Sequence, residues 1–284
     1  FSRKTVIHVD IDKGELGHRL DETMSIHCGL EGFLRAFAGA GPAIPQARQW
    51  IQTVSAWKQR YPSVEGNGVF HVNSIIHEFT KSAPDNTAFV VDVGLCQMGA
   101  AQSACLRKGQ RMFTSAGHGA MGFALPAAIG AAYADNAAGV VCFVGDGALH
   151  MNIQELLMLS RDRLPVHVVL LNNSCLGMIR DYQEKAFSAR YAATVDEFRH
   201  IDYPALAAAY HMNYVRVEDL AGIEQGCHAL RAKEPHFIEV VLDERTDTIP
   251  QAGAGMFSQE PLLERSEIEK FEQEAAACGN IISW

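Results

Sequence analysis

Four segments of the chain are apolar along nearly their whole length: Thr87–Val93, Gly139–Val144, Val166–Leu171 and Phe237–Leu242. A strand that alternates apolar and polar residues buries one face, whereas a strand with an unbroken apolar run must be covered on both faces. Segments with helical spacing separate these strands. The sequence therefore predicts an α/β fold, in which a doubly wound parallel sheet carries helices on both faces.

The predicted order of helices and strands also indicates where a ligand would bind. The expected helices are Val72–Lys81, Gly122–Ala134, Asn152–Arg161, Tyr203–Tyr210 and Ile223–Ala232, with a further short strand at Tyr214–Val217. In parallel sheets of this kind, ligands bind beyond the carboxyl ends of the strands. The loops 93–98, 145–150 and 172–178 each follow a predicted strand, so a site is expected among them.

A chain of 284 residues allows one large domain or two modest ones, at about 150 residues each. The strand-like segment Thr5–Ile11 and the helix-like segment Leu30–Ala40 precede the regular alternation, and Gly66-Asn67-Gly68 is a turn signal between the two parts. The expected parts are the end of a second α/β domain at 1–45, a linker at 46–68, the sheet domain at 69–250 and a C-terminal tail at 251–284.

Two features concern the ends of the chain. The chain begins with Phe1 rather than Met and enters the first strand almost at once, which is typical of a cut edge in a longer polypeptide. The charged run 264–274 in the tail predicts a helix with a solvated face, and the alternative is a lid that folds over the site.

Composition excludes several classes of protein. The net charge of −9 and the lack of a basic block disfavour binding to nucleic acid. The seven cysteines are odd in number and form no C-x-x-C pair, so a reducing, cytoplasmic environment is expected. The longest apolar stretch, 123–134, contains Pro126 and is too short to span a bilayer, so no membrane association is expected.

A glycine pattern at 117–122 (GHGAMG) allows one interpretation of function. It matches G-x-G-x-x-G, which in a dinucleotide-binding fold would be followed by an acidic residue on the ribose, here Asp146. The pattern should directly follow a buried strand, but only two of the residues 110–116 are strongly apolar. A nucleotide-linked, NAD-type oxidoreductase therefore stays an alternative rather than the main hypothesis.

A second pair of loops predicts a metal and diphosphate site. Gly145-Asp146-Gly147 follows the strand Gly139–Val144, and Asn173 follows the next strand. A carboxylate and an amide oxygen at neighbouring strand ends can coordinate a hard cation such as Mg²⁺. The glycines let backbone N–H groups approach phosphate oxygens, and a helix expected to begin near Met151 or Asn152 would add its positive end.

These residues carry a resemblance to a known family. The segment 145–173, GDGALHMNIQELLMLSRDRLPVHVVLLNN, resembles the GDG…NN signature of thiamine diphosphate-dependent enzymes. Further segments resemble the acetolactate synthase-like branch of that family: HVDID (8–12), DVGLCQMGAAQ (92–102), SAGHGAMGFALPAAIGAAYA (115–134) and LNNSCLGMIRDYQE (171–184). The resemblance covers nearly the whole chain. It implies a thiamine diphosphate-binding fold that is preceded, at residues 1–45, by a remnant of another α/β domain.

The resemblance also implies how a metal-bound diphosphate would be held. The Mg²⁺ ligands would be the side chains of Asp146 and Asn173 and the carbonyl of Cys175, whose thiol would not be needed. The implied diphosphate contacts are Gly145, Gly147 and Ala148, the turn Leu176-Gly177-Met178, and the loop Gly94-Leu95-Cys96. The family usually has Gln-His where this chain has Leu95-Cys96, so only backbone contacts are expected from that loop.

Further residues take roles in catalysis and substrate binding by the same resemblance. Met121 would be the apolar wedge beneath the bent cofactor, and the carbonyl of Gly119 would hold its 4′-amino group. Ile179 and Tyr182 match positions that line the substrate pocket, and their character suits small acyl groups.

The resemblance implies a thiamine diphosphate- and Mg²⁺-dependent enzyme that decarboxylates a 2-keto acid and ligates the product to a second carbonyl. Alternatives within the family are a simple 2-keto acid decarboxylase or lyase and a non-catalytic member, the latter because the Gln-His pair is missing. The family's activating glutamate lies on an N-terminal pyrimidine-binding domain of a neighbouring subunit, and no part of this chain resembles that domain. A homodimer or homotetramer, and a chain that is incomplete by itself, are therefore expected.

Overall fold

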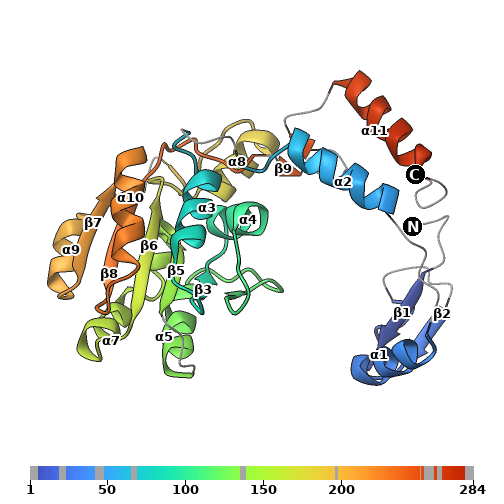
Figure 1. The fold of residues 1–284 in the computed structure, drawn as a ribbon. Coiled ribbons are helices and arrows are strands. Elements are labelled where there is room, and N and C mark those ends of the chain that lie inside the picture. The colour runs from blue at the N-terminus through green and yellow to red at the C-terminus, as the bar shows by residue number, and fades with distance from the viewer. Residues whose placement is uncertain are drawn as a thin grey trace. The chain divides into compact units, whose positions relative to one another are not determined.

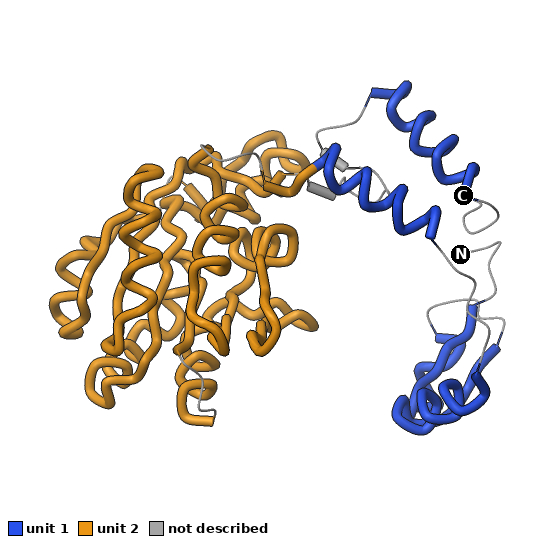
Figure 2. Tube along the Cα trace, viewed as in Figure 1, with its two compact units in different colours: residues 1–61, 263–284 blue, residues 62–262 orange. Residues whose placement is uncertain are grey.

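The computed structural model describes residues 6–18, 24–41, 48–64, 69–134, 139–195, 198–249, 251–252, 259–260 and 264–278. The chain forms two compact units, which Figure 2 distinguishes by colour. One unit comprises residues 62–262, and the other comprises residues 1–61 together with 263–284. The helix in the tail thus groups with the segment that precedes the sheet.

The larger unit is built on a six-stranded, fully parallel sheet (Figure 1). Its strands, in the order in which they lie side by side, are β4 (Arg111–Thr114), β3 (Ala88–Val91), β5 (Val140–Gly145), β6 (Val166–Asn172), β8 (His236–Val241) and β7 (Asn213–Val217). The predicted doubly wound parallel fold is confirmed, because helices cover both faces of this sheet.

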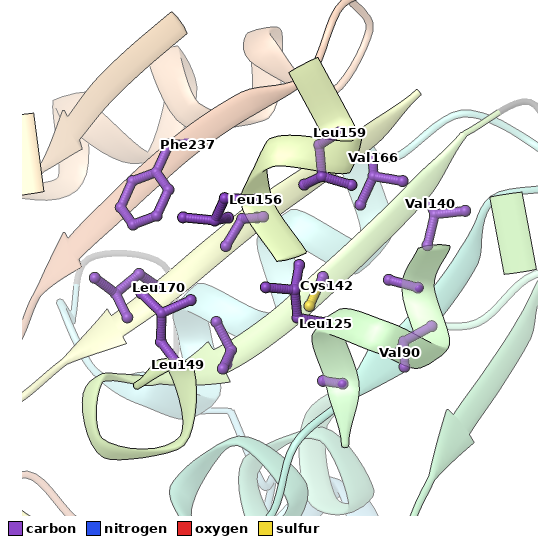
Figure 3. Packing of buried hydrophobic residues seen from close by; sticks show 14 of the residues in the cluster. Val90, Leu125, Val140, Cys142, Leu149, Leu156, Leu159, Val166, Leu170 and Phe237 are labelled. Atoms are coloured by element: carbon purple, nitrogen blue, oxygen red, sulfur yellow. The ribbon is translucent and has the colours of Figure 1, made fainter. Parts of the chain in front are cut away.

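Alternate residues of the same strands feed two separate cores, as the period of two in a strand requires. The helices of this unit are α3 (Val72–Ser82), α4 (Leu95–Ser103), α5 (Ala124–Ala134), α6 (Asp146–Leu149), the 3₁₀ turn η1 (Ile153–Glu155), α7 (Leu156–Arg161), α8 (Gly177–Ala186), α9 (Tyr203–Ala209) and α10 (Leu220–Ala229). On one face Val90, Cys142 and Val168 pack with helices α5, α7 and α9, and on the other Phe89, Phe143 and Val169 pack with helices α3, α4 and α10. Figure 3 shows part of the first core, including Val90, Cys142 and Leu125 of α5.

The strand order creates a switch point between β3 and β5. From β3 the chain moves to β4 on one side, and it then returns to place β5 on the other side of β3. The segments that leave β3 and β5 at their carboxyl ends therefore diverge, and a crevice at such a point is the usual ligand position in open α/β sheets.

Several sequence predictions need correction. Residues 111–114 form the edge strand β4, which pairs only with β3, so a strand does precede the glycine pattern, although an edge strand rather than a buried one. The expected loops 93–98 and 172–178 contain the first residues of α4 and α8. The helix after β5 begins at Asp146 rather than near Met151 or Asn152, because α6 starts directly at the strand end and Asn152 lies in the following turn.

The smaller unit contains two groups of elements. Strands β1 (Ile7–Asp10) and β2 (Met24–His27) pair in parallel, and helix α1 (Leu30–Gly39) follows, which confirms the strand and helix predicted there. No side chain of α1 is buried, and Leu30, Leu34 and Phe37 are exposed. These elements are thus too few to bury their own apolar side chains.

The second group pairs α2 (Arg48–Arg60) with the tail helix α11 (Arg265–Ala277). Trp57 Nε1 donates to Glu274 at 2.5 Å, Tyr61 donates to Glu267 at 2.7 Å, and the rings of Trp57 and Phe271 pack edge to face at 5.0 Å. The charged run of the tail is thus not only a solvated face, since Glu274 accepts a hydrogen bond from Trp57 of α2 and Glu267 accepts one from Tyr61, directly after α2. Two short antiparallel strands, β9 (Gln251–Ala252) and β10 (Gln259–Glu260), lie in the larger unit.

Among the helices of the described residues, none combines the length and the hydropathy that a bilayer crossing requires.

Candidate functional site

A cavity of about 250 Å³ lies at the carboxyl ends of β3, β5 and β6. Three segments that directly follow these strands form most of its wall, and Gly119 and Met121 complete it. The structure brings together every site residue predicted from the sequence except Tyr182: Gly94, Leu95, Cys96, Gly119, Met121, Gly145, Asp146, Gly147, Ala148, Asn173, Cys175, Leu176, Gly177, Met178 and Ile179. Val93 and Leu171 line the same cavity and were not predicted.

Asp146 is the acidic side chain of the cavity wall. It is 2% exposed, and its Oδ1 accepts the N–H of Gly147 at 2.7 Å, whereas its Oδ2 has no hydrogen-bond partner among the described residues. Burial raises its pKa to about 6, and that rise is opposed by the N–H of Gly147 and by the nearby backbone N–H groups of residues 173–175, none of which makes a hydrogen bond to Oδ2. A buried carboxylate oxygen without a partner in a cavity is suited to receive a cation.

Asn173 brings an amide to the same cavity from the end of β6. It is 4% exposed, and its Nδ2 donates to Cys175 Sγ at 3.2 Å. The described residues contain no group of three or more His, Cys, Asp and Glu side chains that could hold a metal ion. One carboxylate, one amide and backbone carbonyls are instead an oxygen-rich set, which suits a hard cation such as Mg²⁺ rather than Zn²⁺.

Three helices begin at the cavity wall: α4 at Leu95, α6 at Asp146 and α8 at Gly177. The first N–H groups of a helix lack partners within the helix and favour an anion. Two of the N–H groups here already have acceptors, because Gly147 donates to Asp146 and Gly177 donates to the carbonyl of Cys175 at 3.0 Å. The buried carboxylate of Asp146 nevertheless suits a cation, and the starts of the three helices suit an anionic group bound beside it.

Close packing explains two of the glycines. A Cβ atom at position 147 would lie 2.2 Å from Leu176 Cδ2 and 3.3 Å from Met121 Cε, and one at position 177 would lie 2.7 Å from Asn173 Nδ2. Glycine at these positions lets the backbone of the first turns of α6 and α8 reach the cavity surface.

Asp92 is a buried residue that the sequence analysis did not single out. It lies at the end of β3, is fully buried, and accepts the N–H groups of Gly122 at 3.2 Å and Ala124 at 2.8 Å. Burial raises its pKa, and these backbone bonds oppose the rise. Asn152 Nδ2 donates to the carbonyl of Gly122 at 2.7 Å from the other side. The only feature of the sequence that could have identified Asp92 was its position, as an acidic residue, at the end of an otherwise apolar strand.

This anchoring shows what the 117–122 segment does. Asp92 and Asn152 hold the third glycine, so the loop places Gly119 and Met121 in the cavity wall. Helix α5 begins only at Ala124, after the glycine pattern, and the strand before the pattern is an edge strand. The dinucleotide arrangement requires a buried strand that runs through the glycines directly into a helix, and this loop lacks it.

Tyr182 lies outside the cavity lining. It is 62% exposed on α8, and its ring packs edge to face on Phe187 at 5.7 Å. Met178 and Ile179, one turn earlier on the same helix, line the cavity and are also exposed. The rim of the cavity is therefore an apolar surface on the first turns of α8.

Comparison with known proteins places these features in a family. The family model described as "Thiamine pyrophosphate enzyme, C-terminal TPP binding domain" matches residues 92–240. The acetolactate synthase large subunit of Lactococcus lactis subsp. lactis is 32% identical over 260 residues, which is 90% of this chain and 44% of that protein. The large subunit from Parasynechococcus marenigrum is 33% identical over 260 residues, or 89% of this chain and 42% of that protein.

A third relative is the isozyme 2 large subunit of acetolactate synthase from Escherichia coli. It is 31% identical over 265 residues, covering 91% of this chain and 47% of that protein. The chain thus spans less than half the length of each of these relatives.

Proposed function

The chain belongs to the thiamine pyrophosphate enzymes, and from this premise we propose that it supplies the diphosphate- and Mg²⁺-binding domain of an acetolactate synthase-like enzyme. The proposed reaction is decarboxylation of a 2-keto acid followed by carboligation to a second carbonyl. The observation that carries the proposal is the unpartnered Oδ2 of buried Asp146, which shares a cavity with Asn173 at the carboxyl ends of β5 and β6.

The proposed roles follow from the chemistry of the wall. Asp146 and Asn173 would ligate Mg²⁺ through side-chain oxygens, and the carbonyl of Cys175 would be the third ligand. That carbonyl already accepts the N–H of Gly177, which leaves one of its two lone pairs for a metal. The first turns of α4, α6 and α8 would face the diphosphate.

The apolar part of the cavity would orient the rest of the cofactor. Met121 and Leu176 both come close to Gly147, so they border the floor on which a cofactor would rest. When bound, thiamine diphosphate stabilises the carbanion left by loss of carbon dioxide. Met121 would contact the cofactor as an apolar wedge, the carbonyl of Gly119 would accept a hydrogen bond from its amino group, and Ile179 on the cavity wall would contact the acyl group of the substrate. Tyr182, on the exposed face of α8, would meet substrate only at the entrance.

The organisation of the chain is part of the proposal. Residues 1–45 would be the end of a central domain, 46–68 a linker, 69–250 the cofactor-binding domain and 251–284 a C-terminal tail. A pyrimidine-binding domain of the same or another subunit would supply the activating glutamate, in a cytoplasmic homodimer or homotetramer. We therefore expect no keto-acid turnover from the 284-residue chain alone.

Calorimetric titration of the 284-residue chain with thiamine diphosphate, with and without Mg²⁺, tests the binding part of the proposal. We expect binding that depends on Mg²⁺, and its loss in Asp146→Ala. NAD titrated in the same way should give no heat of binding. Asp162→Ala is a matched control, because Asp162 is an exposed carboxylate next to the amino end of β6.

Two results would contradict the proposal. One is the absence of Mg²⁺-dependent binding in the wild-type chain, and the other is binding that survives in Asp146→Ala. Binding without turnover of any keto acid, measured together with the pyrimidine-binding domain, would instead favour a non-catalytic member of the family, whereas aldehyde release without ligation would favour a simple decarboxylase.

A further inference from the structure

The carboxamide of Asn173 is held by the thiol of Cys175. Asn173 Nδ2 donates to Cys175 Sγ at 3.2 Å, and Sγ in turn donates to the carbonyl oxygen of Glu244 at 3.4 Å. The Cys175 side chain is 2% exposed, so water does not compete for these bonds. The thiol thus uses both its acceptor and its donor capacity inside the protein.

The acceptor at the end of this chain of bonds is itself fixed. The Glu244 carbonyl also accepts Nη1 of Arg180 at 2.5 Å, and Arg180 is buried on α8. The segment after β8 and the second turn of α8 are therefore joined at one carbonyl oxygen. That junction sets the position to which the S–H of Cys175 points.

The backbone between the two side chains is in an unusual conformation that lets them meet. Ser174 has φ of 55°, the left-handed region that non-glycine residues rarely occupy. Asn172 Oδ1 accepts the N–H of Ser174 at 3.1 Å, and Asn172 Nδ2 donates to buried Glu239 at 2.7 Å. Residues held in such a strained backbone conformation occur at functional sites more often than elsewhere.

A second contact limits rotation of the Asn173 amide. A Cβ atom at position 177 would lie 2.7 Å from Asn173 Nδ2, so the NH₂ group fills the space beside Gly177. The NH₂ group is therefore enclosed between the thiol and the start of α8. The carboxamide oxygen is the atom left to face the cavity that Asn173 and Asp146 share.

We propose that Cys175 is a positioning residue whose thiol orients the Asn173 carboxamide with its oxygen toward the cation. This inference rests on the proposed function, in which Asn173 is a Mg²⁺ ligand. With the amide reversed, an NH₂ group would face the cation and would repel it. The thiol that the sequence comparison left without a role thus takes one, separate from that of the Cys175 carbonyl.

The test compares Cys175→Ala and Cys175→Ser with the wild-type chain by calorimetric titration of Mg²⁺ at a fixed, saturating concentration of thiamine diphosphate. Alanine removes the hydrogen-bond partner of Asn173 Nδ2, and loss of such an outer contact typically weakens metal affinity about 10-fold or more. We expect that loss in Cys175→Ala. Serine keeps one donor and one acceptor, so Cys175→Ser should recover most of the affinity.

The control is Cys227→Ala, which removes another buried thiol, on α10, and should leave the Mg²⁺ affinity unchanged. Melting of each metal-free variant, followed by circular dichroism, separates loss of folded protein from loss of affinity. Wild-type affinity in a folded Cys175→Ala would overturn the inference while leaving the proposed function intact. Equal weakness of the serine and alanine variants would also overturn it, and a wild-type chain that binds no Mg²⁺ with thiamine diphosphate would overturn both.

Discussion

A hollow lies at each end of the parallel sheet, and the two hollows differ in whether their charged side chains are buried or exposed to solvent. The hollow at the carboxyl end measures about 250 Å³ and contains buried Asp146, whose Oδ2 has no hydrogen-bond partner in the described part of the chain. The hollow at the amino end is larger, about 340 Å³, and its polar and charged residues are mostly exposed: Ser160, Arg161, Arg163, His211, Asn213 and Glu234.

This comparison shows that the volume of a hollow does not by itself identify the ligand site. Charges at the amino end are hydrated or paired, as in the contact between Arg161 and Asp162 at 2.7 Å, so a ligand would gain little there. At the carboxyl end the strands run into helix N-termini, which offer N–H groups around a desolvated carboxylate. Helices α7 and α9 instead end at the other hollow, with Arg163 and His211 just after them.

Burial also shifts the pKa of titratable groups at both ends, and the pKa values of Asp146 and His167 move in opposite directions. The pKa of Asp146 is raised to about 6, and the pKa of His167, near the start of β6, is lowered to about 4 by burial and by neighbouring His236. In both cases the charged form is disfavoured. Only Asp146 borders a cavity in which a charged partner could compensate, and the predictions below test that contrast.

The largest effect is expected from Asp146→Asn in the metal-free chain, which should become more stable while it loses Mg²⁺-dependent binding. The raised pKa means that the folded state holds a proton below about pH 6, whereas the unfolded chain releases it above 3.8, so stability falls as pH rises through this window. The charge then costs about 3 kcal/mol at pH 7. Urea denaturation of wild type and Asp146→Asn at pH 7 without metal measures the expected gain in the free energy of unfolding.

Destabilisation of the metal-free protein by Asp146→Asn would mean that the carboxylate is already compensated within the chain. Asp162→Asn, which removes a surface carboxylate paired with Arg161 near the amino end of β6, should change stability by less, because a surface ion pair contributes little, and it serves as the control.

A smaller effect of pH is expected at the amino end from His167→Gln. Because the pKa of His167 is lowered in the folded state, the unfolded chain binds the proton first as pH falls below 6.5, and stability is lost. Between pH 6.5 and pH 5 the variant should gain about 2 kcal/mol relative to wild type. The difference in stability between wild type and His167→Gln does not contain the opposite contribution of Asp146, because both proteins retain that residue.

His211→Gln is the matched control, since His211 is exposed at the rim of the same hollow. A pH dependence that is the same in wild type and His167→Gln would show that His167 can be protonated within the folded protein.

The smallest effect is expected from Arg163→Gly. Arg163 has φ of 48° and lies two residues after the end of α7. Glycine relieves that strain but makes the unfolded chain more flexible, so the net gain in stability should be at most about 1 kcal/mol. Thermal melting measures it, and His211→Gly, with φ of 55° after α9, is a matched second case. Loss of thiamine diphosphate binding in either variant would contradict the division of roles between the two ends.

The fold and most of the cavity wall could be predicted from the sequence because local patterns encode them. Unbroken apolar runs identified β5 and β6. The glycines that flank Asp146 and the position of Asn173 directly after the next strand identified those two residues. The edge strand β4 could not be predicted, because Arg111 and Phe113 are exposed and a strand with one partner needs no apolar run. The first turns of α4 and α8 were taken as loops, because the segments 93–98 and 172–178 each directly follow a predicted strand.

By itself, the sequence determined the doubly wound α/β fold, the order of its strands along the chain and the residue types that gather at the strand ends, since periodicity and glycine placement are local properties. Only the tertiary structure decided which groups lack a partner. It gave Asp146 Oδ2 no partner among the residues that the structure describes, joined Asp92 to the loop 117–122, and set the Cys175 thiol between Asn173 and Glu244. Those outcomes depend on contacts between segments far apart in the chain, and on the removal of water from them, which no local pattern records.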